Sequence, residues 1–534
     1  MCRLCDRGFP QDHSGSRRNF LKTAAATGVA ASALDLLMAG QAAAHDNDRE
    51  PEESGGHGRR YLIRGGAVMS MDPTVGDHAQ ADVLIEGKKI VAIGPNLHAG
   101  GAAVIDARGR IVMPGFIDTH HHLFETSLRS FLANGVLQND KSETVSGETT
   151  YFEFILLKFA PVYRPQDVYI NELFGSLSQL DAGVTTVHDI SQIHHSPRHS
   201  DAAIRGLMDS GRRAVFGYFE SAGAAILGTN PDNKYPDDAV RIKKRWFSSN
   251  DQLVTMIMGG EVYLPGYEKA WKIGRDLGLQ VAAHILSPFG IRPTLDLLAQ
   301  NQGGDSGTLG LGPDNLLVHM TGMSDVGWKG VKDSGAQVSL AVPIEMNMRH
   351  GMPPILKMQE LKLEPSLSSD VECTLTADFF TQMRSTMNVQ RALVNQMILD
   401  TGLPPNPLNP WPLAPFPTGT PELLTTRDVL RYATINGAKA LRLDKKVGSL
   451  APGKEADIII LDAEAINVAP LNNVPGAVVS LMERSNVETV IVAGKVRKWK
   501  GRLLDVNLSR LRRELEDSRD YLFSAAGIAQ NLFR

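Results

Sequence analysis

The sequence has few cysteines, little net charge and no long apolar run, and each absence excludes a class of protein. Its 534 residues include only three cysteines, Cys2, Cys5 and Cys373, too few for a disulfide framework. A formal net charge of −4 gives no sign of a nucleic-acid or polyanion partner. The apolar run from Thr23 to Gly40 is short and interrupted by Asp35, so no stable membrane span is expected.

The first 44 residues are typical of an export signal. The stretch Ser16-Arg17-Arg18-Asn19-Phe20-Leu21-Lys22 matches the twin-arginine pattern, and Ala42-Ala43-Ala44 provides a small-residue cleavage site after the apolar run. An ordinary amphipathic N-terminal helix is the alternative. Cleavage would remove two of the cysteines and leave Cys373 alone. We therefore expect the twin-arginine export machinery as a partner and the bacterial periplasm as the location.

From about residue 113, apolar strands alternate with amphipathic helical segments such as Gly266–Leu279, which favours parallel βαβ units. Eight such strands are the number found in a (β/α)8 TIM-like barrel, so an α/β fold of this type is predicted. The predicted strands are Pro114–His122, Val184–Ile190, Arg213–Glu220, Val254–Gly260, Gln280–Ile285, Leu316–Met320, Gln337–Val342 and Glu364–Asp370.

Short β-rich stretches flank the barrel on both sides and predict a small β-sandwich domain built from both chain ends. Before the barrel, Tyr61–Arg64 and Ala67–Met71 are predicted as two strands separated by Gly65-Gly66. After it, the predicted strands include Asp457–Leu461 and Gly476–Val479.

The last segment has leucines at helical spacing, at positions 508, 511, 515 and 522, and predicts a helix that docks on the body of the protein or on a homodimer partner. The expected organisation is therefore a signal peptide (1–44), a flexible linker (45–60), the N-terminal part of the β-domain (61–112), the barrel (113–440), the C-terminal part of the β-domain (441–504) and a C-terminal helix (505–534).

The stretch Val112–Leu123 contains three consecutive histidines at the end of the first barrel strand. Alternate side chains of a strand point to opposite faces, so His120 and His122 share a face and His121 points away. Two imidazoles so placed can bind one metal ion, and imidazole suits zinc, iron, copper or nickel. A polar strand end with solvated histidines is the alternative. Catalytic groups of such barrels gather where the strands end; other titratable residues at predicted strand ends are His284, His319 and Asp370.

Four stretches of the sequence form a recognisable set of motifs, namely Pro114–His122, Gly183–Val187, Ala433–Ala440 and Val447–Ile458. Through these motifs, the chain from about Tyr61 to Leu504 resembles the amidohydrolase superfamily. It is most similar to the branch that includes triazine chlorohydrolases, guanine deaminase and cytosine deaminase-type enzymes. The resemblance implies that four residues bind one divalent metal ion, zinc by default and iron as the alternative, with His319 beside them. The implied ligands are His120, His122, His284 and Asp370.

The resemblance also bears on the number of metal ions, and electrostatics then indicates the chemistry. Two-metal relatives use a carbamylated lysine at the end of strand four, whereas Leu253–Glu261 contains no lysine, which favours one ion. A bound cation lowers the pKa of its water, so that hydroxide is available at pH 7 to attack the substrate. We expect Asp370 to orient this water and accept its proton. We expect His319 to stabilise the charge that develops in the tetrahedral intermediate.

One position departs from the branch. Its aminohydrolases usually carry a glutamate, a proton shuttle, three residues after the strand-five histidine, and here that position is Ser287. A serine hydroxyl is not a general acid at neutral pH. Either another carboxylate substitutes or the substrate does not need that proton. Among candidate replacements we rank Glu261 first as a catalytic residue, ahead of Glu220, Glu345 and Glu372.

The sequence thus predicts an amidohydrolase that cleaves a non-peptide carbon–nitrogen bond (amide, urea-like or cyclic) of a small heterocyclic or aromatic molecule. The first alternative is a deaminase or dechlorinating hydrolase of the same branch with a relocated proton shuttle. The second is a catalytically silent periplasmic protein that binds metal or ligand, because metal ligands can persist where the acid is lost.

Overall fold

The structure is a computed structural model that describes residues 51, 54–138, 150–223, 232–301, 309–400 and 419–533. The predicted signal peptide lies outside these residues, as does half of the predicted linker. Among the described helices, none has both the length and the apolar character needed to cross a membrane.

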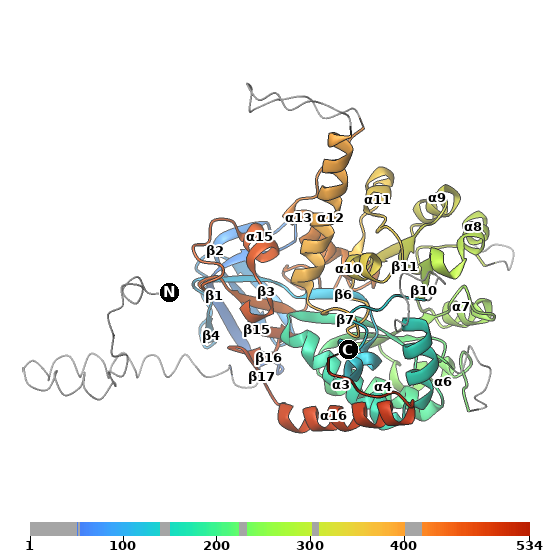
Figure 1. The fold of residues 1–534 in the computed structure, drawn as a ribbon. Coiled ribbons are helices and arrows are strands. Elements are labelled where there is room, and N and C mark those ends of the chain that lie inside the picture. Colours follow the sequence, from blue (N-terminus) through green and yellow to red (C-terminus); the bar gives the residue numbers. More distant parts are fainter. Residues whose placement is uncertain are drawn as a thin grey trace, which may run out of the picture. The chain divides into compact units, whose positions relative to one another are not determined.

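Eight parallel strands form a barrel, which confirms the predicted fold class (Figure 1). Each barrel strand pairs with the next barrel strand along the chain. The predicted and observed ends of the strands agree within a few residues. The barrel strands are β6 (Phe116–His121), β7 (Val184–Ser191), β8 (Arg213–Tyr218), β9 (Val254–Gly259), β10 (Val281–Leu286), β11 (Asn315–Thr321), β12 (Gln337–Leu340) and β13 (Ser366–Leu367).

Helices connect these strands, as expected for parallel pairing. They include η2 (Leu123–Leu128), η4 (Tyr151–Phe159), η5 (Ala160–Val162) and η6 (Ser287–Phe289), whereas η8 (Arg484–Asn486) precedes β15 (Val487–Val492) of the second sheet. The longer helices of the barrel region are α3 (Pro165–Asp181), α4 (Pro197–Asp209), α6 (Ala239–Trp246), α7 (Tyr267–Asp276), α8 (Arg292–Gln300), α9 (Asp325–Ser334), α10 (Val342–Asn347), α11 (Ile355–Leu361), α12 (Phe379–Leu399), α13 (Thr426–Tyr432) and α14 (Ile435–Ala440).

The barrel closes between its first strand and the chain that follows its last. The Thr119 hydroxyl, on β6, donates to the carbonyl of Leu367 on β13 at 2.9 Å. Further along, the Asp370 amide donates to the His120 carbonyl at 3.0 Å, and the His122 amide donates to the Asp370 carbonyl at 2.9 Å. Residues 120–122 and Asp370 are therefore held together by main-chain bonds.

A second, nine-stranded sheet combines strands from both ends of the chain, drawn in blue and red in Figure 1. β5 pairs with β14 in antiparallel register, with Val112 opposite Ile460. The two strands predicted around Gly65-Gly66 are one strand, β1, whose pairing with β2 is irregular at the glycines. The strands are β1 (Arg60–Met69), β2 (Asp77–Glu86), β3 (Lys89–Gly94), β4 (Ala103–Asp106), β5 (Arg110–Pro114), β14 (Ile458–Asp462), β15 (Val487–Val492), β16 (Lys495–Trp499) and β17 (Arg502–Leu503).

The strand predicted at Gly476–Val479 is wrong, because this segment is helical. It forms α15 (Val474–Gly476) and the helical turn η7 (Ala477–Leu481). The Asn473 side chain caps the start by accepting from the amide of Gly476, and Pro475 occupies an early helical position. A short apolar run is compatible with a buried strand or a buried helix, and here the cap decides.

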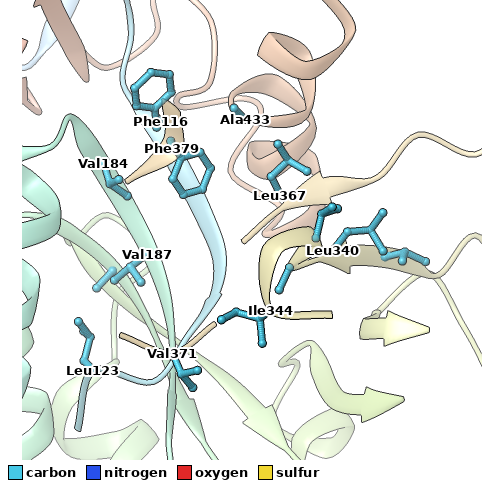
Figure 2. Packing of buried hydrophobic residues seen from close by; sticks show 14 of the residues in the cluster. Phe116, Leu123, Val184, Val187, Leu340, Ile344, Leu367, Val371, Phe379 and Ala433 are labelled. Carbon is cyan, nitrogen blue, oxygen red and sulfur yellow. The ribbon is translucent and has the colours of Figure 1, made fainter. Parts of the chain in front are cut away.

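The barrel packs around a continuous apolar core, part of which is shown in Figure 2. The Phe116 ring, at the start of β6, stacks on Phe379 with ring centroids 5.7 Å apart and meets Phe380 edge-on at 5.3 Å. A buried ion pair joins the barrel to the second sheet. The Arg213 guanidinium on β8 donates to both carboxylate oxygens of Asp457, at 2.8 and 3.0 Å.

The C-terminal helix α16 (Leu508–Ala525) packs on α3 of the same chain. Leu511 is buried against Ile170, Leu173 and Leu177. The Arg164 guanidinium lies over the Tyr521 ring, 3.3 Å from its centroid. The leucine stripe of the sequence therefore docks on the body of the chain.

Candidate metal centre

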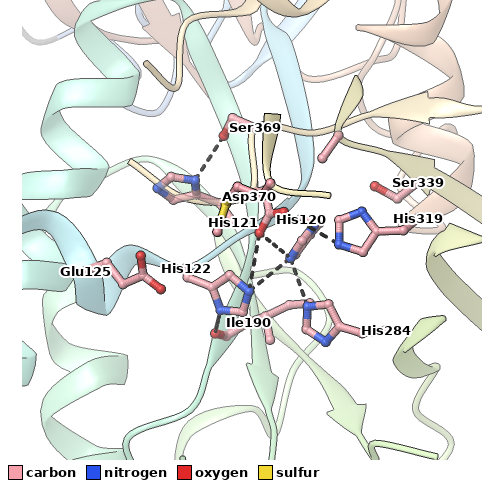
Figure 3. A network of polar contacts seen from close by, with 12 residues as sticks. His120, His121, His122, Glu125, Ile190, His284, His319, Ser339, Ser369 and Asp370 are labelled. Atoms are coloured by element: carbon pink, nitrogen blue, oxygen red, sulfur yellow. Dashed lines mark hydrogen bonds and ion pairs between the residues drawn. The ribbon is translucent and has the colours of Figure 1, made fainter. Parts of the chain in front are cut away.

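Three imidazoles and one carboxylate converge at the carboxyl ends of the barrel strands (Figure 3). His120 lies on β6, His122 directly follows that strand, and His284 lies on β10. The Nε2 atom of His120 lies 3.1 Å from the Nε2 atoms of both other rings. Asp370, after β13, places Oδ1 3.3 Å from His120 Nε2 and 3.7 Å from His122 Nε2. All four side chains are buried.

Two of the rings are oriented from behind by hydrogen-bond acceptors. His122 Nδ1 lies 3.1 Å from the carbonyl oxygen of Ile190, and His284 Nδ1 lies 2.5 Å from Oε1 of Glu261. A neutral imidazole has one N–H, so these acceptors place it on Nδ1 and leave the Nε2 lone pair directed at His120. Lone pairs directed at one point are stabilised by a cation. The donor set therefore fits a metal ion, and zinc and iron both accept such nitrogen and oxygen ligands.

The electrostatics of His120 and His122 agree with this fit. Burial lowers the pKa of His120 and His122, and neighbouring histidines lower it further, so both rings are neutral as metal ligands must be. Burial also acts to lower the pKa of His284, but the Glu261 carboxylate outweighs it and raises that pKa. Burial raises the pKa of Asp370 to about 7, against the opposing charge of His284.

His319, on β11, lies on the other side of Asp370. Its Nε2 atom is 3.5 Å from Oδ2 of Asp370, and its Nδ1 atom is 3.1 Å from Oε1 of Glu345. His319 and Asp370 have φ angles of +71° and +62°. Such left-handed backbone is uncommon for side chains larger than glycine and tends to occur at functional sites.

The Asp118 carboxylate hydrogen-bonds to the backbone beside two ligand candidates, and the sequence did not predict this role. Its Oδ1 atom accepts the amides of His120 and Ser369, each at 3.2 Å, and its Oδ2 atom accepts the Ser369 hydroxyl. That hydroxyl also contacts Nδ1 of His121 at 2.9 Å, so His121 has a partner away from the centre. A carboxylate two residues before the paired histidines was the available signal. Asp118 links the first strand to the residue preceding Asp370.

A partly open pocket leads to the centre. Its described lining contains no lysine or arginine. It also contains a histidine that sequence reasoning did not select, His350. The lining residues are His122, Leu137, Tyr151, Leu156, Gln192, Tyr263, His284, Leu286, Phe289, His319, Met348, His350, Asp370 and Val371.

None of the four carboxylates considered as replacements at Ser287 is among these lining residues. Glu261 contacts His284 with both oxygens, since its Oε2 atom accepts that residue's amide at 3.1 Å. Glu220 accepts the amide of Glu261 at 2.9 Å. Glu345 contacts His319, and Glu372 accepts two N–H groups of Arg129, at 2.5 and 3.0 Å. The carboxylate ranked first therefore lies behind a metal-ligand candidate.

We expect Glu261→Gln to weaken zinc binding about 10- to 100-fold, because carboxylates that orient ligating histidines contribute about that much affinity. Competition with a chromophoric chelator measures the change. Glu364→Gln, which alters a carboxylate paired with Arg431, is the matched control. Unchanged zinc affinity with a loss of turnover alone would instead favour Glu261 as the proton shuttle.

A parallel barrel with imidazoles and a carboxylate gathered at its strand ends defines a metal-dependent barrel hydrolase. Residues 111–497 match the amidohydrolase family, and the chain belongs to that family. The prediction of a hydrolase that acts on carbon–nitrogen bonds other than peptide bonds is thereby confirmed.

Three known proteins show what the chain is similar to in sequence or in fold. The 5′-deoxyadenosine deaminase of Methanosarcina acetivorans is 26% identical over 476 residues, covering 87% of this chain and 99% of the relative. An adenosine deaminase from Xanthomonas campestris with bound zinc has a TM-score of 0.69 and 19% identity, covering 88% of this chain and 99% of that one. Atrazine chlorohydrolase from Arthrobacter aurescens TC1, complexed with zinc, has a TM-score of 0.68 and 20% identity, covering 86% and 100%.

Proposed function

We propose that this protein uses one divalent metal ion, zinc by default and iron as the alternative, to hydrolyse a carbon–nitrogen bond of a small, uncharged heterocyclic or aromatic molecule. The observation that carries the proposal is the convergence of His120, His122, His284 and Asp370 at the floor of a largely apolar pocket. The absence of lysine and arginine from the described lining disfavours an anionic substrate. Leu253–Glu261, which spans β9, contains no lysine, and this supports a single ion.

The side chains then have separate tasks. When bound, a divalent cation lowers the pKa of a water molecule towards neutrality. Asp370 faces His120 and His122 with its Oδ1 atom and His319 with its Oδ2 atom. It accepts the proton of the attacking water. Burial raises the pKa of Glu345, so its protonated carboxyl can donate to Nδ1 of His319 and leave the N–H on Nε2. That N–H then donates to the substrate atom on which negative charge develops. Glu261 fixes the ring of His284 and is a positioning residue in this proposal.

Deamination is the second candidate, and the name of the Methanosarcina acetivorans relative favours it. Serine at position 287 speaks against it, because that position carries no acid for the leaving amine. Dechlorination is a variant of the same alternative, supported by the chlorohydrolase neighbour. Membership of the amidohydrolase family disfavours the silent binding protein.

The proposal extends to location. The twin-arginine pattern at Ser16–Lys22 supports export to the periplasm through the twin-arginine machinery. For the homodimer that we considered, the leucine stripe offers no support, because it packs on α3.

The test is elemental analysis of the mature protein from the periplasmic fraction, followed by a screen of aromatic amides, cyclic amides, aminopurines and chlorotriazines. We expect about one zinc or iron per chain and turnover of amides without release of ammonia from ring amines or of chloride. Ammonia or chloride release would move the conclusion to the deaminase or dechlorinating alternative. Two ions per chain would contradict the single-ion proposal. Metal without any turnover would leave the binding protein.

A further inference from the structure

His350 lies in the loop between α10 and α11 and contributes its side chain to the pocket. The side chain is almost fully buried, and its ring meets the ring of His319 edge-on with centroids 4.7 Å apart. Within the described part of the chain, neither ring nitrogen of His350 has a hydrogen-bond partner. A buried polar group without a partner is costly, so its retention in a native structure calls for an explanation.

The backbone around His350 holds the ring in this place. Arg349 has a φ of +60° and Gly351 a φ of +122°, so left-handed residues flank it on both sides. A Cβ atom on Gly351 would lie 3.3 Å from Cβ of Thr321. The Thr321 hydroxyl, at the end of β11, donates to the His350 carbonyl at 2.7 Å. Strain of this kind persists only where the surrounding structure imposes it.

The other polar groups at this end of the pocket are engaged. His319 has Glu345 at one nitrogen and Asp370 at the other. Ser287 is not among the lining residues and packs against Gly322. Among the described histidines that line the pocket, His350 therefore has the most unused hydrogen-bonding capacity.

Burial lowers the pKa of His350 to about 3, so the ring is neutral at physiological pH. A neutral imidazole offers one donor and one acceptor. One of its ring nitrogens lies within 4.8 Å of ligand atoms of His319 and Asp370. The lining of the same pocket also includes the apolar or aromatic side chains of Leu137, Phe289 and Met348. A flat ring with a heteroatom at its edge matches both features.

We propose that His350 is a substrate-binding residue, which hydrogen-bonds a ring nitrogen of an uncharged heteroaromatic substrate seated in the pocket. It supplies a polar contact that Ser287 does not make. The inference rests on the proposed function only in placing the substrate in this pocket. The contact itself transfers no proton, so binding can be measured without turnover.

The test uses the zinc-loaded mature chain and four probes of the same shape. Picolinamide, nicotinamide and isonicotinamide place one ring nitrogen at each position around the ring, and benzamide has none. Isothermal titration calorimetry gives the four affinities. We expect at least one pyridine amide to bind about three- to tenfold more tightly than benzamide, the gain typical of one neutral hydrogen bond.

The variants isolate the imidazole. His350→Phe should bring the affinities of all four probes together, His350→Gln should restore part of the preference, and Met348→Leu, in the same lining, should retain it. The proposal is overturned if the unaltered protein binds all four probes equally, or if it binds none of them. A preference that survives in His350→Phe also overturns the proposal. Chelation of zinc by picolinamide would produce such a preference. Zinc lost from His350→Phe would make His350 a metal ligand and also overturn it. Preferential binding without hydrolysis would leave the inference standing while the proposed function failed.

Discussion

We expect His284→Ala to be purified with far less than one metal ion per chain and to lose turnover by at least about a thousandfold. A metal site of this type supplies several kcal/mol of transition-state stabilisation, and about 4 kcal/mol corresponds to a thousandfold in rate. His284 comes from β10, a different strand from the paired histidines, and alanine removes its Nε2 atom without touching β6. Elemental analysis and turnover of the same preparation measure both effects.

His199→Ala is the matched control, because it removes a histidine that contacts Ser196 and the Tyr163 carbonyl instead of the metal centre. It should keep its metal. A His284→Ala protein that holds one ion per chain with unchanged affinity would contradict the ligand assignment. Loss of metal in both variants would show a general effect on folding.

Asp370→Asn should retain metal in excess zinc but lose turnover by about 10²- to 10⁴-fold, the range that a general base contributes. The three imidazoles still supply enough ligands for zinc. Asparagine tolerates the left-handed backbone of position 370 better than other replacements, so the chain that closes the barrel is preserved. The amide cannot accept a proton from the attacking water.

Asp325→Asn, at the exposed start of α9, is the control and should leave turnover unchanged. Substantial turnover by a metal-loaded Asp370→Asn protein would remove Asp370 from its proposed role as proton acceptor. Loss of metal even in excess zinc would show that Asp370 contributes mainly as a ligand.

The barrel strands could be predicted from sequence because buried parallel strands are apolar runs separated by amphipathic helices. Strand ends then predict where side chains gather, and the four ligand candidates and His319 do lie together. The run at Gly476–Val479 shows the limit of this reasoning. Its residues suit a strand, and only the cap from Asn473 and the packing of the fold make it helical.

Other features depend on contacts between distant residues. Glu261 follows β9 and was therefore among the titratable residues expected at a strand end. The sequence could not show that both carboxylate oxygens of Glu261 contact His284. His350 follows no strand and reaches the pocket through a turn with left-handed residues on both sides. Gly351 was the only local sign of that turn, and glycine alone does not say where a neighbouring ring points.

The closure of the barrel at Asp370 also bears on the order of events during synthesis. His120 and His122 emerge with the first barrel strand, His284 with the fifth and Asp370 only after the eighth. A nascent chain therefore presents at most three of the four ligand candidates until nearly the whole barrel has been made. Because Asp370 reaches the others through main-chain bonds to residues 120 and 122, the complete ligand set exists only when the two ends of the barrel have met. Assembly of all four ligand candidates is thus a marker of finished folding.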